Sequence, residues 1–349
     1  MIHRVVFSVL LLAVFWSRNE RLHTKDAIIS SEGEEPITLV VTERTPMTEI
    51  AGELIDRNVL AISIEEFTWI SRTHGWNQAR PGYYELGRHT PISSWLRDLG
   101  LGLQQQVTLT IPIGTTPERL FQLLGNTLRT DSASIASSFE SMIEGYPEAE
   151  RMTLFSRILP VNHTVFWTIP EDELWQRLLE PMNVLEQRHQ ERISADDVHP
   201  SVNEMSFFDV LTLASITEWE ALYDDEKPTI SGLYLNRLQR GMRLQADPTV
   251  NFAVGERRAL LYEDYRVQHP YNTYLFRGLP PSPITNPSQS SIESIYNAEK
   301  HDYLYMVATP ERTHEFNETY AEHLADVELW QQWRAEQRRL KRERERALE

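Results

Sequence analysis

The pattern of apolar and polar positions begins with the one long apolar run, from Val5 to Ser17, between two arginines. Thirteen helical residues would extend about 20 Å, less than the ~30 Å hydrocarbon core of a bilayer. No small-x-small cleavage site follows the run, so the pattern favours an uncleaved signal anchor at residues 1–18 over a cleaved signal peptide. We expect residues 19–36 to be a polar tether, and the rest of the chain to lie outside the cytoplasm.

Short strands and amphipathic helices alternate after the tether. Strands are predicted at Ile37–Val41 and just after Pro81, with helices over 47–56, 65–74 and 92–99. A weaker strand, turn and helix pattern recurs about seventy residues later, with a strand at Val107–Ile111 and a helix after it. The repetition predicts a small α/β module followed by a half copy, together covering residues 37–125.

The chain changes character from Phe155 onward. Ser206-x-x-Asp209 is typical of a capping box at the start of a helix, and Pro228 marks the first turn of the next helix. A long segment rich in Pro and Asn follows at 269–288, which favours a functional loop. The strand-like run Tyr303–Ala308 is expected to close this region, before a charged helix at 328–349. The predicted fold class is α+β.

The composition excludes several classes of site and partner. The chain has 34 Lys+Arg against 51 Asp+Glu, a net charge of −17, which argues against nucleic acid as a partner. There is no cysteine, and therefore no disulfide, thiolate metal site or Cys nucleophile. His314 and His323 are nine residues apart without other metal-type spacing, so we expect no metal and no cofactor.

One carboxyl group has the surroundings that a general acid requires. Glu218 lies on the apolar stripe of its predicted helix, at helical spacing from three residues: Phe207, Leu211 and Ala214. Burial on such a stripe disfavours the charged form and raises the pKa, so that the group can donate a proton near neutral pH. The alternative is a structural ion pair with Arg237 or Arg243. Glu220 is rotated about 200° around the helix, and is expected to be a structural or supporting acid.

Four separated motifs occur in the order seen in one enzyme family: LASITEWE, NRLQRGMRLQADPTV, YNTYLFRGLPPSPITNPS and HEFNETYAEHL. Over roughly residues 155–327 the chain resembles the YceG-like endolytic murein transglycosylases (the MltG family). The stretches TERTPMTEIAGEL and RPGYYEL extend the resemblance more weakly into residues 37–125, which are similar to that family's LysM-like module. The chain departs from the family pattern at Trp219, at Ser282 and over Asn251–Ala253.

The resemblance implies cleavage of peptidoglycan glycan strands between N-acetylmuramic acid and N-acetylglucosamine, giving 1,6-anhydro ends without water as a reactant. It implies a catalytic domain at 126–327, in which Glu218 protonates the glycosidic oxygen and then takes the proton of the sugar's own 6-hydroxyl. A single-pass inner-membrane protein that faces the periplasm fits this layout, with peptidoglycan synthases as candidate partners. The alternatives are a non-catalytic peptidoglycan-binding protein, or a hydrolase that pairs Glu218 with Asp247.

Several polar residues of the shared motifs are candidates for substrate binding or support. Gln245, Asp247 and Thr249 offer groups that hydrogen-bond acetamido groups or orient Glu218, although an Asp-Pro turn explains Asp247 equally well. The remaining candidates come from other motifs: Asn236, Asn272, Thr273, Tyr274 and His314. Asn272 to Tyr274 provide the donors, acceptors and flat ring that a sugar face requires, with loop packing as the alternative. His314 lines the cleft or is a surface or structural histidine.

Overall fold

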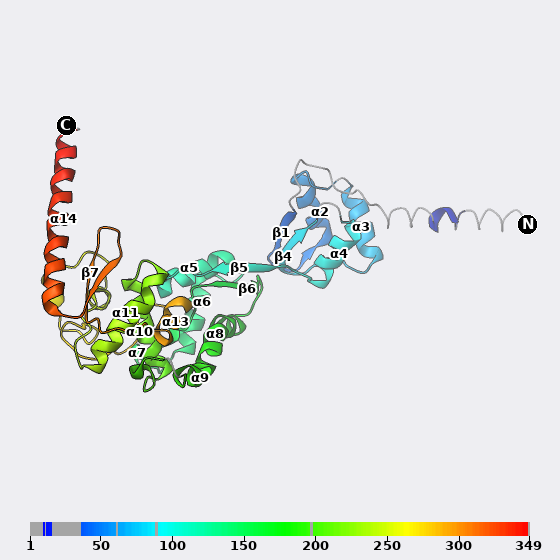
Figure 1. Cartoon of the computed structure of the whole chain (residues 1–349). Helices are drawn as coiled ribbons and strands as arrows, with labels where there is room; N and C mark the ends of the chain where they lie inside the picture. The colour runs from blue at the N-terminus through cyan, green and yellow to red at the C-terminus, as the bar shows by residue number, and fades with distance from the viewer. Residues whose placement is uncertain are drawn as a thin grey trace, which may run out of the picture. The chain divides into compact units, whose positions relative to one another are not determined.

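The computed structural model describes residues 10, 12–15, 36–60, 62–87, 90–195 and 198–347 (Figure 1). The predicted anchor at 1–18 and tether at 19–36 therefore lie almost wholly outside the described residues. Among the helices that are described, none combines the length and the apolar character needed to cross a membrane.

The described chain forms two compact units. The N-terminal unit contains residues up to Leu109, together with Gln122–Ile135 and Thr164–Leu174. The C-terminal unit contains Thr110–Phe121, Ala136–His163 and everything from Trp175 onward.

Two small antiparallel pairs and three helices make up most of the N-terminal unit (Figure 1). Strand β1 (Ile37–Val41) pairs with β4 (Gly82–Leu86), and β2 (Thr45–Pro46) pairs with β3 (Gln78–Ala79). The helices are α2 (Met47–Asp56), α3 (Ile64–Thr73) and α4 (Ile92–Leu101). Alternate residues of β1 are buried, as the period of two predicts. The strand at 37–41 and the helix at 47–56 are confirmed, and the helices predicted at 65–74 and 92–99 are confirmed within two residues.

The predicted recurrence of a strand and a helix is also present. Strand β5 (Gln106–Thr110) precedes α5 (Pro117–Thr127), and β5 pairs with β6 (Asn162–Phe166). Four further helices lie between residues 132 and 193: α6 (Ser132–Met142), α7 (Glu148–Ser156), α8 (Glu171–Gln187) and α9 (His189–Ile193). Whether this region is a separate domain, as the boundaries at 37–125 and 126–327 predict, stays a prediction.

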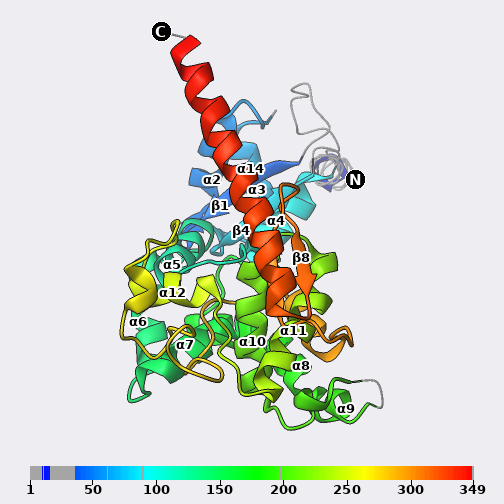
Figure 2. The ribbon, with the colours of Figure 1, turned by 60° about the vertical axis from the view of Figure 1, so that its left-hand side comes forward.

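Helix α10 (Phe207–Glu220) is the centre of the C-terminal unit (Figure 2). It packs against α11 (Lys227–Gln239), α12 (Asp247–Val254) and α13 (Gln289–Tyr296). Three short 3₁₀ turns complete the region: η1 (Pro200–Val202), η2 (Asp224–Glu226) and η3 (Asp264–Arg266). Because α10 is apolar on nearly every side, it is buried between other helices rather than lying on the surface.

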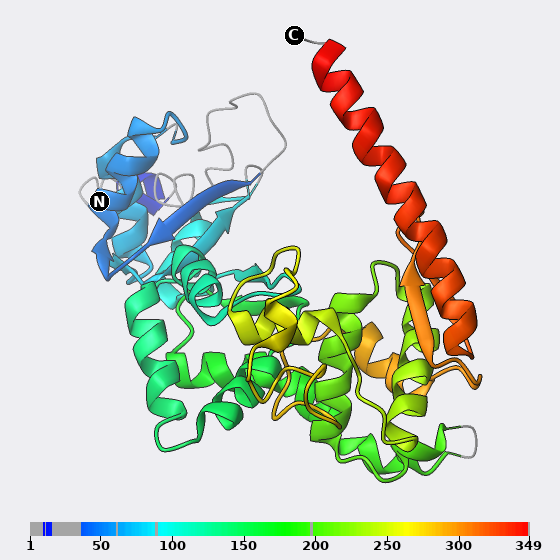
Figure 3. The ribbon, with the colours of Figure 1, turned by 90° about the vertical axis from the view of Figure 1, so that its left-hand side faces the viewer.

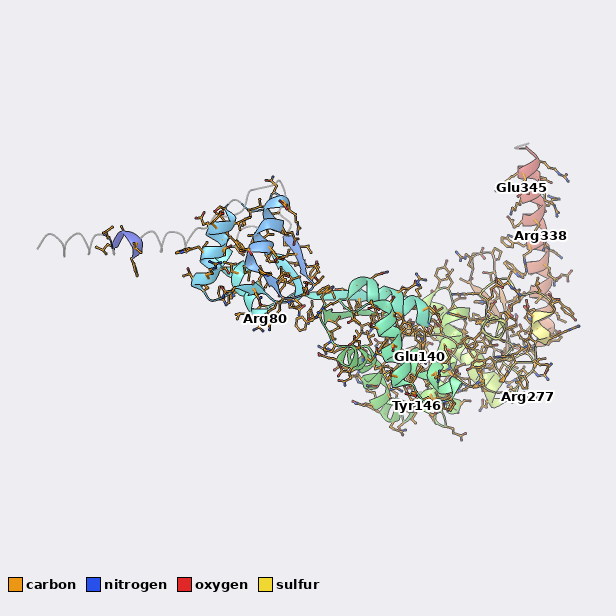
Figure 4. The ribbon with its side chains drawn as sticks, turned by 180° about the vertical axis from the view of Figure 1, so that it is seen from behind. Arg80, Glu140, Tyr146, Arg277, Arg338 and Glu345 are labelled. Carbon is orange, nitrogen blue, oxygen red and sulfur yellow. The ribbon has the colours of Figure 1, made fainter. Side chains whose placement is uncertain are left out.

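The chain ends in a hairpin and a long helix. Strands β7 (Tyr305–Ala308) and β8 (His314–Asn317) pair, and α14 (Tyr320–Ala347) packs on both. The strand predicted at Tyr303–Ala308 is therefore present, but it is followed by a second strand and does not close the region. Beyond the hairpin α14 extends away from the rest of the C-terminal unit (Figure 3), and its residues Arg338 and Glu345 lie on this extended part (Figure 4).

Candidate active site

The last turn of α10 places two carboxyl groups on different sides of one helix. The helix begins with the predicted capping box, in which Asp209 N donates to Ser206 Oγ (3.1 Å) and Ser206 N donates to Asp209 Oδ2 (2.9 Å). It ends at Glu220, because Ala221 has an extended backbone. Glu218 and Glu220 are two residues apart, and an α-helix turns by about 200° over that interval. Their surroundings accordingly differ.

Glu218 is buried and fully engaged. Its Oε1 accepts from Lys227 Nζ at 3.3 Å, and both side chains of this ion pair are about 5% exposed or less. Its Oε2 accepts from Ser288 N (2.8 Å) and Ser291 Oγ (2.7 Å), and also from the Ser288 hydroxyl. The expected alternative of an ion pair is thus present, but with Lys227 and not with Arg237 or Arg243.

The partners of Glu218 belong to the starts of two other helices. Lys227 is the first residue of α11, and Ser288 is the N-cap of α13. A carboxylate at a helix N-terminus satisfies backbone N–H groups that have no partner inside the helix. Glu218 therefore connects α10 with α11 and α13.

Glu220 has the opposite surroundings. Its side chain is partly accessible, yet Oε2 is completely buried. Within the described part of the chain, neither this oxygen nor the neighbouring Tyr234 hydroxyl completes a hydrogen bond of normal geometry. Burial, and then the negative charge of Asp247, raise the pKa of the Glu220 carboxyl to about 7. The Tyr234 hydroxyl and the Arg237 guanidinium oppose this shift in pKa without cancelling it.

Asp247, which acts on Glu220, is held by two tyrosines. The Tyr274 hydroxyl donates to Oδ1 at 2.7 Å, and the Tyr265 hydroxyl donates to Oδ2 at 3.3 Å. The two rings pack edge to face with their centroids 4.7 Å apart. Burial and the Asp247 carboxylate raise the pKa of Tyr265 to about 12, so this hydroxyl stays a donor at neutral pH.

The other motif residues near Asp247 build the loop that carries it. Thr249 Oγ1 lies 2.8 Å from Thr273 Oγ1, which accepts from Ala246 N at 3.0 Å. Gln245 has a positive φ of 51°, and its N–H donates to Thr273 O. Asn272 is completely buried and donates to the carbonyls of Tyr265 and Val267, so the structure places it in loop packing.

Two predicted residues lie among other groups. Asn236 Nδ2 donates to the carbonyls of His301 (2.8 Å) and Tyr303 (3.1 Å), which attaches α11 to the segment before β7. The backbone N–H of His314 donates to Glu226 Oε1 at 2.7 Å, and its ring lies 3.5 Å from the same carboxyl group. The structure thus gathers Glu220, Gln245, Asp247, Thr249, Thr273 and Tyr274, while Asn236 and His314 have structural contacts elsewhere.

Sequence reasoning missed four residues of this region: Lys227, Tyr234, Arg237 as a neighbour of Glu220, and Tyr265. Tyr234 and Arg237 are three residues apart and share a face of α11, a spacing that was available in the sequence. Lys227 and Tyr265 carry no such signal, because only the tertiary fold brings them to Glu218 and Asp247.

A cavity of about 740 Å³ is lined by Trp219, the residue between Glu218 and Glu220 in the sequence. Asn251, one helical turn after Asp247 on α12, lines it as well, whereas neither Glu218 nor Glu220 is among its lining residues. Phe155, Phe252 and Tyr271 supply aromatic walls. Among the described residues no three His, Asp or Glu side chains are grouped as a metal site would require.

Comparisons with known proteins identify the relatives of the chain. The model of the YceG-like family matches residues 39–329. A Bacillus subtilis endolytic murein transglycosylase is 22% identical over 306 residues, which cover 84% of this chain and 85% of that protein. A Streptococcus pneumoniae endolytic murein transglycosylase is 25% identical and matches 80% of this chain, which spans about half of that longer protein (55%). The crystal structure of a YceG-like protein from Listeria monocytogenes superposes with a TM-score of 0.53 at 26% identity, covering 84% of this chain and 99% of that one.

Proposed function

The chain belongs to the YceG-like family, and on that premise we propose that it cuts murein glycan strands from within and leaves 1,6-anhydro ends on muramic acid. The enzyme is a lytic transglycosylase, a carbon–oxygen lyase that acts on a polysaccharide. A lyase of this kind needs one group that both donates and accepts a proton, and it needs no activated water.

The observation that carries the proposal is the carboxyl group of Glu220. Its pKa of about 7 keeps much of it protonated at neutral pH, and its partial accessibility leaves a route to substrate. A general acid works best when its pKa is close to the working pH. Its buried Oε2, which has no hydrogen-bond partner in the part of the chain that the structure describes, fits a group whose hydrogen-bonding capacity is kept for the reaction.

The reaction requires two proton transfers at this one group. The Glu220 carboxyl donates its proton to the glycosidic oxygen, the bond from that oxygen to the anomeric carbon breaks, and the leaving sugar departs with a new hydroxyl. The 6-hydroxyl of the muramic ring then attacks the anomeric carbon and gives its proton to the Glu220 carboxylate. The acid is regenerated, and neither water nor a second nucleophile is consumed, unlike in the usual glycosidase pair.

Glu218 remains the residue that sequence reasoning proposed for this role, and the geometry favours Glu220 instead. Both oxygens of Glu218 are occupied by Lys227, Ser288 and Ser291. A proton donor in that position would have to break an ion pair and the N-terminal contacts of α13 before it reached a substrate. Asp247, held by Tyr274, acts on the pKa of Glu220 and supports that residue as the acid.

We also propose the domain organisation of the chain and its location in the cell. We assign the first part of the N-terminal unit, residues 37–90, to a LysM-like module that holds glycan, and the region up to 125 to its half copy. Residues 126–327 would be the catalytic domain and 1–18 a single membrane anchor, with the catalytic domain in the periplasm near peptidoglycan synthases. The family match from residue 39 supports placing the module within the shared architecture.

Mass spectrometry of the products tests the function. The full chain, purified in detergent, is incubated with uncrosslinked glycan strands, and the new strand ends are weighed. We expect fragments with anhydro ends from cuts at internal bonds. Reducing ends, heavier by the mass of one added water, would instead show a hydrolase that pairs an acid with Asp247. Strands that stay intact but bound would show a non-catalytic peptidoglycan-binding protein.

A further inference from the structure

The cavity lined by Trp219 has a cationic edge. The guanidinium of Arg257 lies 4.7 Å from the centre of the Trp219 ring, and both residues line the cavity. Arg257 is exposed, and no carboxylate of the described residues forms an ion pair with it. One face of the Trp219 indole is therefore covered by a cation.

The next residue shows that this arrangement is specific to Arg257. Arg258 forms an ion pair with Asp264 at 2.7 Å and another with Glu256 at 3.1 Å. The two consecutive arginines thus have different contacts. Arg258 holds the loop between Glu256 and Asp264 through its ion pairs, whereas the charge of Arg257 stays available at the cavity.

The indole N–H of Trp219 is a second available donor. Its Nε1 is buried, and the residues that the structure describes provide it with no hydrogen-bond acceptor. Gly114, at a positive φ of 69°, lies opposite, and a Cβ there would be 3.5 Å from Nε1 and 3.9 Å from Arg257 Nη1. The glycine thus leaves the space in front of both donors free of any side chain.

The remaining lining is mostly apolar, with Phe155, Pro281 and Ile284 on the walls. Two carboxyl groups also border the cavity: Glu256, which is paired with Arg258, and the exposed Glu118. A suitable ligand therefore combines small apolar groups with an anionic acceptor for Arg257 and Trp219. In a chain of net charge −17, a cation without a carboxylate partner among the described residues attracts an anion locally at the cavity, against the overall charge.

We propose that this cavity binds the acidic peptide that is attached through the lactyl group to muramic acid, with a peptide carboxylate on Arg257 and Trp219 Nε1 and the methyl groups on the apolar walls. The proposal rests on the proposed function for its substrate, and adds that the enzyme recognises strands by their peptides. Trp219 is adjacent to Glu220 in the chain, and on this basis we place the bound peptide on the muramic acid whose bond is cut.

Two forms of substrate test the proposal: strands with their peptides, and the same strands after an amidase has removed them. We expect the wild type to cleave peptide-bearing strands with a kcat/KM about tenfold higher, the size of one charge-assisted contact. Arg257→Gln should lose that preference while cleaving stripped strands at the wild-type rate. Glu118→Gln should increase the preference, because it removes a like charge. Arg258→Lys, which can keep its acid partners, is the matched control and should retain it.

A binding measurement separates this proposal from the proposed function. A soluble muramyl dipeptide that ends in glutamate with free carboxylates is titrated into the full chain by calorimetry, with no cleavage required. Binding that is about tenfold weaker in Arg257→Gln, and weaker also in Trp219→Phe, would support the site even if no strand were cut. Equal binding by these variants and the wild type, or equal cleavage of both strand forms, overturns the proposal and leaves the assignment of Glu220 intact.

Discussion

The two sides of the last turn of α10 show what the same carboxyl group becomes in different surroundings. On the side of α13, Glu218 meets an ammonium group and three hydroxyl or amide donors, and it is a structural connection. On the side of α12, Glu220 meets a second carboxylate, and one of its oxygens has no hydrogen-bond partner among the described residues. Burial raises the pKa of this carboxyl group to about 7. The difference teaches that burial alone does not make a general acid, because the donors around a buried carboxyl decide its role.

The largest expected effect is on catalysis by Glu220. Glu220→Gln preserves the shape and removes the transferable proton, so we expect the rate of anhydro-product formation to fall by about 10²–10⁴. In the wild type, kcat/KM should decrease as the pH rises through about 7, where the Glu220 carboxyl loses its proton. If Glu220→Gln still cuts while Glu218→Gln is inactive and stable, the assignment of the two acids is reversed.

The stability of the same variant provides an independent check. An unfolded Glu220 loses its proton near pH 4.5, whereas the folded protein holds it until about pH 7. The folded state binds more protons in that window, so this residue makes the wild type less stable as the pH rises from 4.5 to 7. The melting temperature of Glu220→Gln relative to wild type should therefore be higher at pH 8 than at pH 4.

The second largest effect is on the stability of the C-terminal unit, to which the contacts of Glu218 contribute. Glu218→Gln leaves Asp224, at 2.7 Å, as the remaining carboxylate partner of the buried Lys227 ammonium, and should lower the free energy of unfolding of the C-terminal unit by about 2 kcal/mol. Lys227→Met added to Glu218→Gln should recover part of the loss. Glu53→Gln, which removes a surface ion pair with Arg57, should cost less than about 1 kcal/mol in denaturant titrations. A loss for Glu218→Gln no larger than this control would refute the structural role.

A smaller effect is expected at Asp247. Asp247→Asn removes the negative charge that is the second cause of the raised pKa of Glu220, so the pKa should fall toward its ordinary value. The alkaline limb of kcat/KM should move to lower pH, and moving it by about one pH unit lowers kcat/KM at pH 8 by about a factor of ten. Tyr274→Phe keeps the carboxylate and should move the limb less. An unchanged limb in Asp247→Asn would show that the two acids do not interact.

The smallest effect concerns a single hydroxyl of α13. Ser291→Ala removes the 2.7 Å hydrogen bond to Glu218 Oε2 and should cost about 1 kcal/mol of stability with little change in kcat. Ser294→Ala, on the same helix but away from Glu218, is the matched control for activity. A large fall in kcat for Ser291→Ala alone would point to Glu218 as a participant in the reaction.

Regular alternation made the N-terminal elements predictable. The strand at 37–41 alternates buried and exposed residues, and the helix at 47–56 has a clear apolar face. Helix α6, with the sequence SASIASSFESM, was not predicted, because its small polar residues give a weak pattern. Helix α14 begins at Tyr320 and not at 328, after a Thr319 to Glu322 capping interaction that the sequence did contain.

The residues of the candidate site could be predicted from the sequence, but the contacts between them could be predicted less well. The motifs contained both acids, Asp247 and Tyr274, and helix periodicity separated Glu218 from Glu220. Which of the two acids would be held in an ion pair depended on Lys227 and Ser288. Both contact Glu218 from the starts of two other helices. No local spacing encodes such a meeting, because it depends on how three helices pack.

The connection made by Glu218 has a consequence for the energy of the reaction itself. It fixes the end of α10 to two neighbouring helices, two residues before the acid that we propose to react. The dipoles around Glu220 are therefore oriented before the substrate arrives, and little reorganisation energy is needed as positive charge develops on the sugar. Breaking the Glu218–Lys227 ion pair should therefore raise the activation barrier, whereas the loss of the single Ser291 hydroxyl leaves that ion pair in place.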